Sequence, residues 1–111
     1  MSKPITVDKI INKLPSRFLP ENAEGINAVF QFELDDDSDF YIQINDGLCQ
    51  VEKGLHDDPN LTLITDAETM IGVVSGDIDG MSAFMKGRLR AEGNVILATK
   101  LGKLFSREKR K

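Results

Sequence analysis

The sequence contains one cysteine, one histidine and no tryptophan, and these shortages exclude several classes of protein. A single cysteine, Cys49, rules out an internal disulfide framework and suits a reducing cytoplasm. One histidine, His56, falls short of the convergent ligands that a zinc site needs. No apolar run approaches the roughly 18 residues of a membrane span. The first residues, MSKPITVDKI, lack the apolar region of a signal peptide.

Recognisable catalytic motifs are also missing. The chain has no G-x-G-x-x-G, no P-loop and no G-x-S-x-G sequence. The run DDDSD (35–39) opens like a calcium loop, but Phe40 and Asp46 stand where that loop requires glycine and glutamate. We therefore expect a hairpin turn at this run. We also expect no cofactor, no metal site and no enzymatic activity.

Charge is distributed unevenly over the 111 residues, whose net charge is −4. The rest of the chain carries eight basic and seventeen acidic residues, while positions 100–111 hold one acid, Glu108, and six basic residues: Lys100, Lys103, Arg107, Lys109, Arg110 and Lys111. An acidic body argues against nucleic-acid binding, which needs a basic face. The basic tail, 107–111, is expected either to keep the terminus solvated or to contact an anionic membrane surface.

Hydrophobic periodicity in the first half predicts a helix followed by four strands. Apolar residues at helical spacing mark the helix, which Pro15 should end or kink after Leu14: Val7, Ile10, Ile11, Leu14 and Phe18. Residues 26–34 and 40–45 alternate with period two, so their even-numbered apolar side chains should face the helices. Asp46-Gly47 predicts a type I′ hairpin turn before a strand at 48–53. With a fourth strand at 61–65, the connection lengths predict an antiparallel meander.

Helical spacing returns in the second half of the chain. Asp66 is a suitable N-cap for one helix, and Asp77 or Asp79 for the next, which should end at Gly87. Leu89 and Ala91 predict a short fifth strand. The last helix is expected over 94–107, although Gly102 inside it costs about 1 kcal/mol relative to alanine.

Flexible apolar side chains are concentrated in the second half. Met70, Met81 and Met85 fall within sixteen residues, and methionine suits adaptable apolar sites. The last helix is apolar over an arc wider than packing on a sheet requires. These residues form either a solid core or a site for an oily ligand, and the composition alone leaves both interpretations open.

Three segments resemble the sterol carrier protein type 2 (SCP-2) lipid-binding domain family. They are LPENAEGINAVFQFEL (19–34), IQINDG (42–47) and, most specifically, SGDIDGMSAFMKGRLRAEGNVILATKLGKLF (75–105). The resemblance implies an α+β fold with a mainly antiparallel five-stranded sheet, covered on one face by about five helices. It also implies a hydrophobic tunnel between these two layers, in a single domain over residues 1–111.

The resemblance and the apolar pattern together give a set of expected lipid-binding residues. Phe84, Met85 and Leu89 should flank the tunnel and Gly87 should make the helix-to-strand turn. The full set is Phe30, Phe32, Ile42, Ile44, Met70, Ile71, Val74, Met81, Phe84, Met85, Leu89, Leu97, Leu101, Leu104 and Phe105. The chain stops at REKRK, without a Ser-Lys-Leu-like peroxisomal address, so a cytoplasmic location is expected.

Three functions compete on this reading of the sequence. The leading hypothesis is a non-catalytic carrier that binds, transfers or shields a fatty acyl chain, a sterol-like lipid or an isoprenoid lipid. The alternative is an accessory module that holds a hydrophobic intermediate for enzymes of lipid or quinone biosynthesis. A small thioesterase ranks last because the chain offers no base and nucleophile pair. The sequence leaves the ligand, the partner enzymes and the oligomeric state open.

Overall fold

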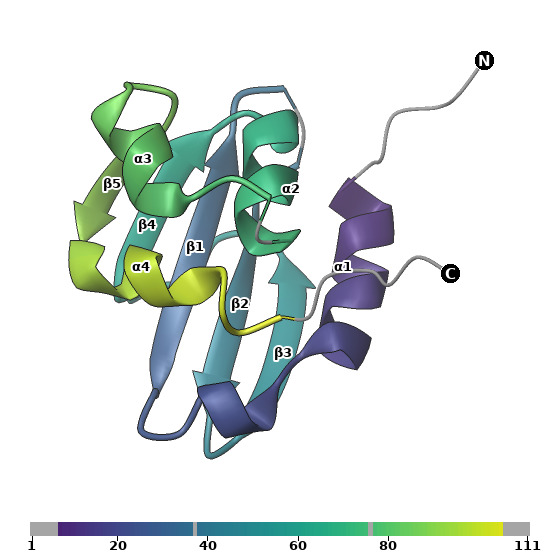
Figure 1. Ribbon diagram of the computed structural model, residues 1–111. Helices are drawn as coiled ribbons and strands as arrows, with labels where there is room; N and C mark the ends of the chain where they lie inside the picture. The colour runs from purple at the N-terminus through teal and green to yellow at the C-terminus, as the bar shows by residue number, and fades with distance from the viewer. Residues whose placement is uncertain (1–6, 37, 76, 106–111) are drawn as a thin grey trace, which may run out of the picture.

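The computed structural model describes residues 7–36, 38–75 and 77–105, and the predictions for the basic tail therefore lie outside the described residues. The description also leaves out the side chains of Val7, Asp8, Ile10 and Ser75. Figure 1 shows one sheet with α2, α3 and α4 over one of its faces and α1 beside them. The elements are α1 (Val7–Arg17), η1 (Pro20–Asn22), β1 (Ala28–Leu34), β2 (Phe40–Asn45), β3 (Leu48–Lys53), β4 (Leu61–Thr65), α2 (Ala67–Ser75), α3 (Gly80–Met85), β5 (Arg90–Gly93), η2 (Val95–Leu97) and α4 (Ala98–Leu101).

The expected α+β architecture is confirmed, but the sheet is mixed and the predicted meander is wrong. Its strand order is β3-β2-β1-β4-β5. The central strand β1 pairs antiparallel with β2 and parallel with β4, so that Phe30 lies opposite both Ile42 and Leu61. The last pair, β4 with β5, is antiparallel. The chain therefore crosses the sheet between β3 and β4.

The crossing segment, residues 54–60, explains why β4 runs parallel to β1. It passes over the sheet face opposite the helices and is fastened there by Gln31, whose Nε2 donates to Gly54 O at 3.0 Å. Gln31 Oε1 accepts a hydrogen bond from His56 N at 2.8 Å. Asn60 Oδ1 accepts another from Val29 N at 2.8 Å. These bonds place Leu61 on the far side of β1, where a parallel register follows.

Side chains on the helix-facing side of the sheet form the core, as the alternation in the sequence predicted. Phe30, Phe32, Phe40 and Ile42 have no exposed surface, and the rings of Phe32 and Phe40 stack with centroids 4.8 Å apart. Burying aromatic and branched side chains of this size contributes about 1.5–3 kcal/mol each. Gln31 points to the opposite face as expected, yet it is only 2% exposed because the crossing segment covers it.

Local turn and cap chemistry follows the sequence closely. Asp46 and Gly47 have φ angles of 55° and 75°, as a type I′ turn requires. Asp66 Oδ1 accepts a hydrogen bond from Thr69 N at 2.7 Å and caps α2. Asp79 caps α3 in the same way by accepting from Ser82 N at 3.0 Å.

Both terminal helices differ in extent from what the sequence predicted. Pro15 does not end α1, which continues to Arg17, because a proline this close to the end of a helix removes few of its backbone hydrogen bonds. The single helix expected over 94–107 is wrong: η2 and α4 occupy its first part, and α4 ends at Leu101 with Gly102 as its C-cap. Asn22 Nδ2 donates to Lys103 O and Leu19 N donates to Leu104 O, each at 2.8 Å. These donors take the carbonyls that a longer helix would use.

Candidate functional site

The candidate site is the apolar layer between the sheet and the helices. Ten of the fifteen residues expected to bind lipid lie together in its buried cluster: Phe30, Phe32, Ile42, Ile44, Met70, Val74, Leu89, Leu101, Leu104 and Phe105. Ile71 and Leu97 are partly buried and pack against this cluster. The structure thus brings side chains from the sheet, α2, α4 and the following turn into contact. Their role in binding a ligand stays a prediction.

Three residues of the expected set lie away from the fully buried layer. Met81 is half-buried, whereas Phe84 is 42% exposed and Met85 is 78% exposed. All three belong to α3, a helix of only six residues. Since α3 exposes its C-terminal end, Phe84 and Met85 lie at the margin of the layer and outside its core.

Glycines allow the helices that cover the layer to approach one another closely. A Cβ atom on Gly72 of α2 would overlap the side chain of Ile78, and one on Gly80 would lie 3.3 Å from Ala98 O. The chain then turns at Gly87, whose φ of 77° is costly for other residues. The short helices α2, α3 and α4 can therefore share one apolar face of the sheet.

The chemistry of this layer is limited to burial. Within residues 7–36, 38–75 and 77–105 the buried polar side chains are Gln31, Thr65 and Thr69. Gln31 fastens the crossing segment, and Thr65 Oγ1 donates to Arg88 O at 3.0 Å. No buried side-chain N or O atom in this part of the chain lacks a hydrogen-bond partner. The layer is therefore suited to apolar groups.

The thiol of Cys49 lies beside the layer on β3, opposite Ile44 of β2. Burial raises the pKa of the Cys49 thiol to about 11, because the thiolate would lose its hydration. Such a thiol is a poor nucleophile at neutral pH. The structure therefore agrees with its interpretation as a small packing residue.

Metal binding finds no support in the described part of the chain. It contains no group of three or more histidine, cysteine, aspartate or glutamate side chains that could hold a metal ion. Two carboxylates of the acidic run accept backbone hydrogen bonds: Asp39 Oδ1 from Leu34 N and Asp36 Oδ1 from Ala67 N, each at 2.9 Å. These two carboxylates are therefore engaged in hydrogen bonds with backbone N–H groups.

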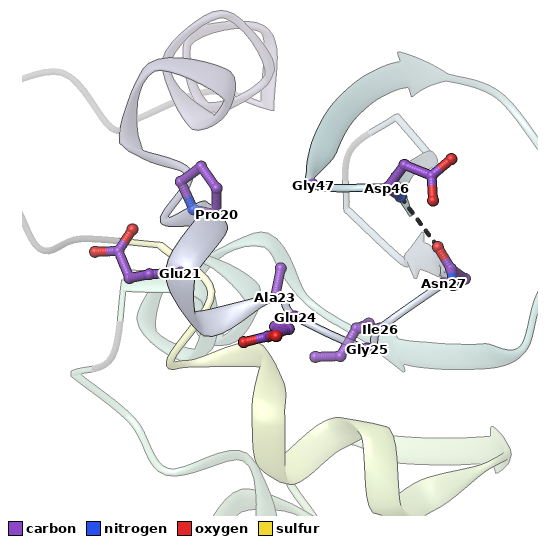
Figure 2. A pocket seen from close by; sticks show the side chains of 9 residues that line it. All are labelled: Pro20, Glu21, Ala23, Glu24, Gly25, Ile26, Asn27, Asp46 and Gly47. Carbon is purple, nitrogen blue, oxygen red and sulfur yellow. Dashed lines mark hydrogen bonds between the residues drawn. The ribbon is translucent and has the colours of Figure 1, made fainter.

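A pocket that the sequence did not predict opens beside the layer (Figure 2). Its volume is about 460 Å³, and η1 and the β2–β3 turn lie on opposite sides of it. The lining residues are Pro20, Glu21, Ala23, Glu24, Gly25, Ile26, Asn27, Asp46 and Gly47. Ala23 belongs to the buried cluster and Ile26 packs against it, so the pocket borders the apolar layer.

Two segments about twenty positions apart in the sequence create this pocket. Asp46 N donates to Asn27 Oδ1 at 3.0 Å and fixes the turn beside the start of β1. The volume lies in the range of small-molecule sites. Two glycines, Gly25 and Gly47, could have indicated the pocket from the sequence. Both have positive φ angles, and the chain turns at each of them beside the opening.

No helix among the described residues is both long enough and apolar enough to cross a membrane.

Comparisons with known proteins place this geometry in a family. The model of the SCP-2 sterol transfer family matches residues 8–106. Peroxisomal multifunctional enzyme A of Dictyostelium discoideum is 41% identical over 51 residues, which are 46% of this chain and 12% of that enzyme. The chain therefore spans a small part of the curated relative it matches.

Solved structures show the same fold at low sequence identity. The sec-alkylsulfatase Pisa1 from Pseudomonas sp. has a TM-score of 0.83 at 16% identity, with 95% of this chain and 17% of that chain covered. Palmitated SCP2L2 from Aedes aegypti has a TM-score of 0.64 at 21% identity, with 89% of this chain and 93% of that chain covered. The fold thus occurs both within a much longer chain and in a chain of similar length.

Proposed function

The chain belongs to the SCP-2 sterol transfer family, and on that premise we propose that it binds one lipid molecule in the apolar layer and shields it from water without catalysing a reaction. The ligand class is a fatty acyl chain, a sterol-like lipid or an isoprenoid lipid. The observation that carries the proposal is the composition of the layer, in which ten residues of the expected set form one apolar cluster. Burial of apolar surface at about 25 cal/mol per Å² suffices to hold such a ligand.

The helices that cover the layer are suited to let a ligand in. They span only four to nine residues in α2, α3 and α4, and short helices owe most of their stability to packing. Thr65 Oγ1, at the end of β4, donates to Arg88 O at 3.0 Å in the segment between α3 and β5. A lipid tail that replaces side-chain contacts with equivalent apolar contacts separates the layers at little cost in free energy.

The pocket beside η1 offers a route from solvent to this layer. Its floor includes Ala23 and Ile26, which adjoin the buried cluster. Three of its lining residues, Glu21, Glu24 and Asp46, are acidic.

The test is a titration with a fluorescent polyene fatty acid, followed by displacement with palmitic acid, a sterol and a long-chain prenol. Leu97→Gln removes a partly buried leucine that packs against the cluster. We expect it to weaken binding about five- to thirty-fold, which corresponds to about 1–2 kcal/mol of lost apolar burial. The matched control is Leu48→Gln, because Leu48 is 70% exposed on the far edge of the sheet.

Two results would contradict the proposal. One is the absence of saturable binding by the unchanged protein. The other is an equal loss of affinity in Leu97→Gln and Leu48→Gln, because that would place the probe outside the layer. Turnover of an acyl thioester would reject the non-catalytic part of the proposal. A lipid that stays bound until a partner enzyme is added would favour the accessory-module alternative.

A further inference from the structure

The charges of the described chain are divided between two regions. Residues 80–105 hold one acid, Glu92, and five basic residues, all of them exposed: Lys86, Arg88, Arg90, Lys100 and Lys103. The described residues before Gly80 hold four basic and fifteen acidic residues. The α3–β5–α4 region is therefore positive on a protein whose net charge is −4.

Exposed apolar side chains gather in the same region. Of the six large hydrophobic residues that are exposed in the described chain, four fall between positions 84 and 96. They are Phe84 at 42%, Met85 at 78%, Val95 at 38% and Ile96 at 66% exposed. We call residues Phe84–Ile96 the β5 margin, because they begin at the end of α3, include β5 and end in η2.

The β5 margin lies at one end of the molecule. β5 is the edge strand next to β4, whereas α1 packs at the opposite edge, against β3. Figure 1 shows α3 and β5 together on the side of the sheet away from α1. The other two exposed apolar residues, Leu48 and Leu55, lie in and just after β3. Apolar and basic groups thus coincide at the β5 edge.

The charge pattern selects among the occupants that such a surface admits. An added strand is disfavoured because β5 has only four residues and exposes Arg90 and Glu92, and short charged edges discourage strand pairing. A second copy docked on this margin would bring Lys86, Arg88 and Arg90 of both copies into proximity, and like charges repel. An anionic lipid surface satisfies both features, since it attracts cations and accepts apolar side chains at its interface.

We propose that the β5 margin docks on anionic lipid bilayers, with Met85 and Ile96 entering the interface and Lys86, Arg88 and Arg90 facing the lipid head groups. The acidic residues before Gly80 are repelled from the same surface, which sets the orientation of this part of the chain. This inference rests on the proposed lipid binding for its purpose, because a carrier collects its ligand from a membrane. It concerns a surface distinct from the buried layer.

The size of the effect follows from the charges involved. Each lysine or arginine close to an anionic surface strengthens binding by about fivefold at physiological salt. The attraction falls off over a Debye length of about 8 Å. Removing two of the cations at the margin should therefore weaken vesicle binding by about twenty-fivefold, and added salt should weaken it further.

The experiment measures co-sedimentation of the full chain with vesicles of phosphatidylcholine containing about 30% phosphatidylserine, and with vesicles of phosphatidylcholine alone. Lys86→Gln/Arg90→Gln removes two cations at the margin, and Lys13→Gln/Lys53→Gln is the matched charge control from α1 and β3. Ile96→Gln removes an exposed apolar group, and Leu48→Gln is its control at the far edge. The fluorescent fatty-acid titration in solution is run on every variant.

We expect binding to anionic vesicles only, a loss of about twenty-fivefold in Lys86→Gln/Arg90→Gln, and a loss of several-fold in Ile96→Gln. Both controls should bind vesicles more tightly than their partner variants. Equal binding to neutral and anionic vesicles would overturn the proposal, and so would equal losses in a variant and its control. Self-association that Ile96→Gln abolishes would also overturn it, because the margin would then join two copies.

The two proposals fail in different ways. Fatty-acid binding without vesicle binding overturns the docking surface and leaves the carrier function standing. Vesicle binding without fatty-acid binding overturns the carrier function and leaves the docking surface standing.

Discussion

At the scale of single residues, sequence alternation assigns faces correctly but does not reveal what covers them. Gln31 alternates with Phe30 and Phe32 and points away from the helices, as predicted. Its burial could not be foreseen, because it depends on a segment 23 or more positions later folding back over β1. A buried amide needs all its partners, and here Phe40 O, Gly54 O and His56 N supply them.

The thiol of Cys49 gives a prediction at this scale. Burial raises its pKa from 9.0 to about 11, so its thiolate fraction at neutral to mildly basic pH is about a hundredfold lower than that of a free thiol. We expect alkylation by iodoacetamide at about pH 8 to be slower by the same factor in the folded protein than in concentrated urea. Mass spectrometry of timed samples measures both rates. Equal rates would show that Cys49 is open to solvent.

At the scale of elements, the chain follows local rules where the signal is local. The caps at Asp66 and Asp79 and the turn at Asp46-Gly47 lie where the sequence predicted them. Strand direction was missed, because the alternation of Leu61, Leu63 and Thr65 specifies a face and leaves direction open. The last helix was overextended, because Leu19 and Asn22, which bind the carbonyls after Leu101, lie some eighty positions earlier.

The N-cap of α2 gives the prediction at this scale. Hydrogen bonds from the backbone and side chain of Thr69 lower the pKa of Asp66 below its ordinary value of 3.8. Asp66→Ala should therefore destabilise the protein by about 1 kcal/mol near neutral pH. The stabilising effect of the carboxylate is present above about pH 3.8 and is lost as the pH falls through the lowered pKa.

Urea unfolding of the unchanged protein and of Asp66→Ala, at neutral and at strongly acidic pH, measures this difference. It should be largest at neutral pH and shrink in acid. Asp57→Ala is the control, because Asp57 is an exposed carboxylate in the crossing segment. A loss of stability in Asp57→Ala as large as that in Asp66→Ala would reject the capping role.

At the scale of the whole molecule, the sequence predicted the layers and the family, and the residues expected to bind lipid mostly share one cluster. The exposure of Phe84 and Met85 escaped prediction, because helical spacing does not tell how short α3 is or where the sheet ends. The pocket beside η1 escaped it as well, since its two sides come from separate turns.

Ligand binding in the layer should stabilise the whole fold. A ligand that binds only the folded state adds about 2.7 kcal/mol at a free concentration of about 100 times Kd. For a domain of about this size, that gain raises Tm by more than about 10 °C. Calorimetry with and without a neutral lipid measures the shift, which should be smaller for Leu97→Gln at the same lipid concentration. An unchanged Tm would mean that the lipid leaves the packed layer untouched.

The central position of β1 has a consequence for how the chain matures on the ribosome. β1, β2 and β3 are the first strands to emerge and can pair by hairpins, but β4, β5 and the helices α2, α3 and α4 come after residue 60. Until residues 61–105 have been synthesised, the apolar face of β1 and β2 lacks the three helices that lie over it in the folded protein. The nascent chain thus passes through a stage at which aggregation competes with folding.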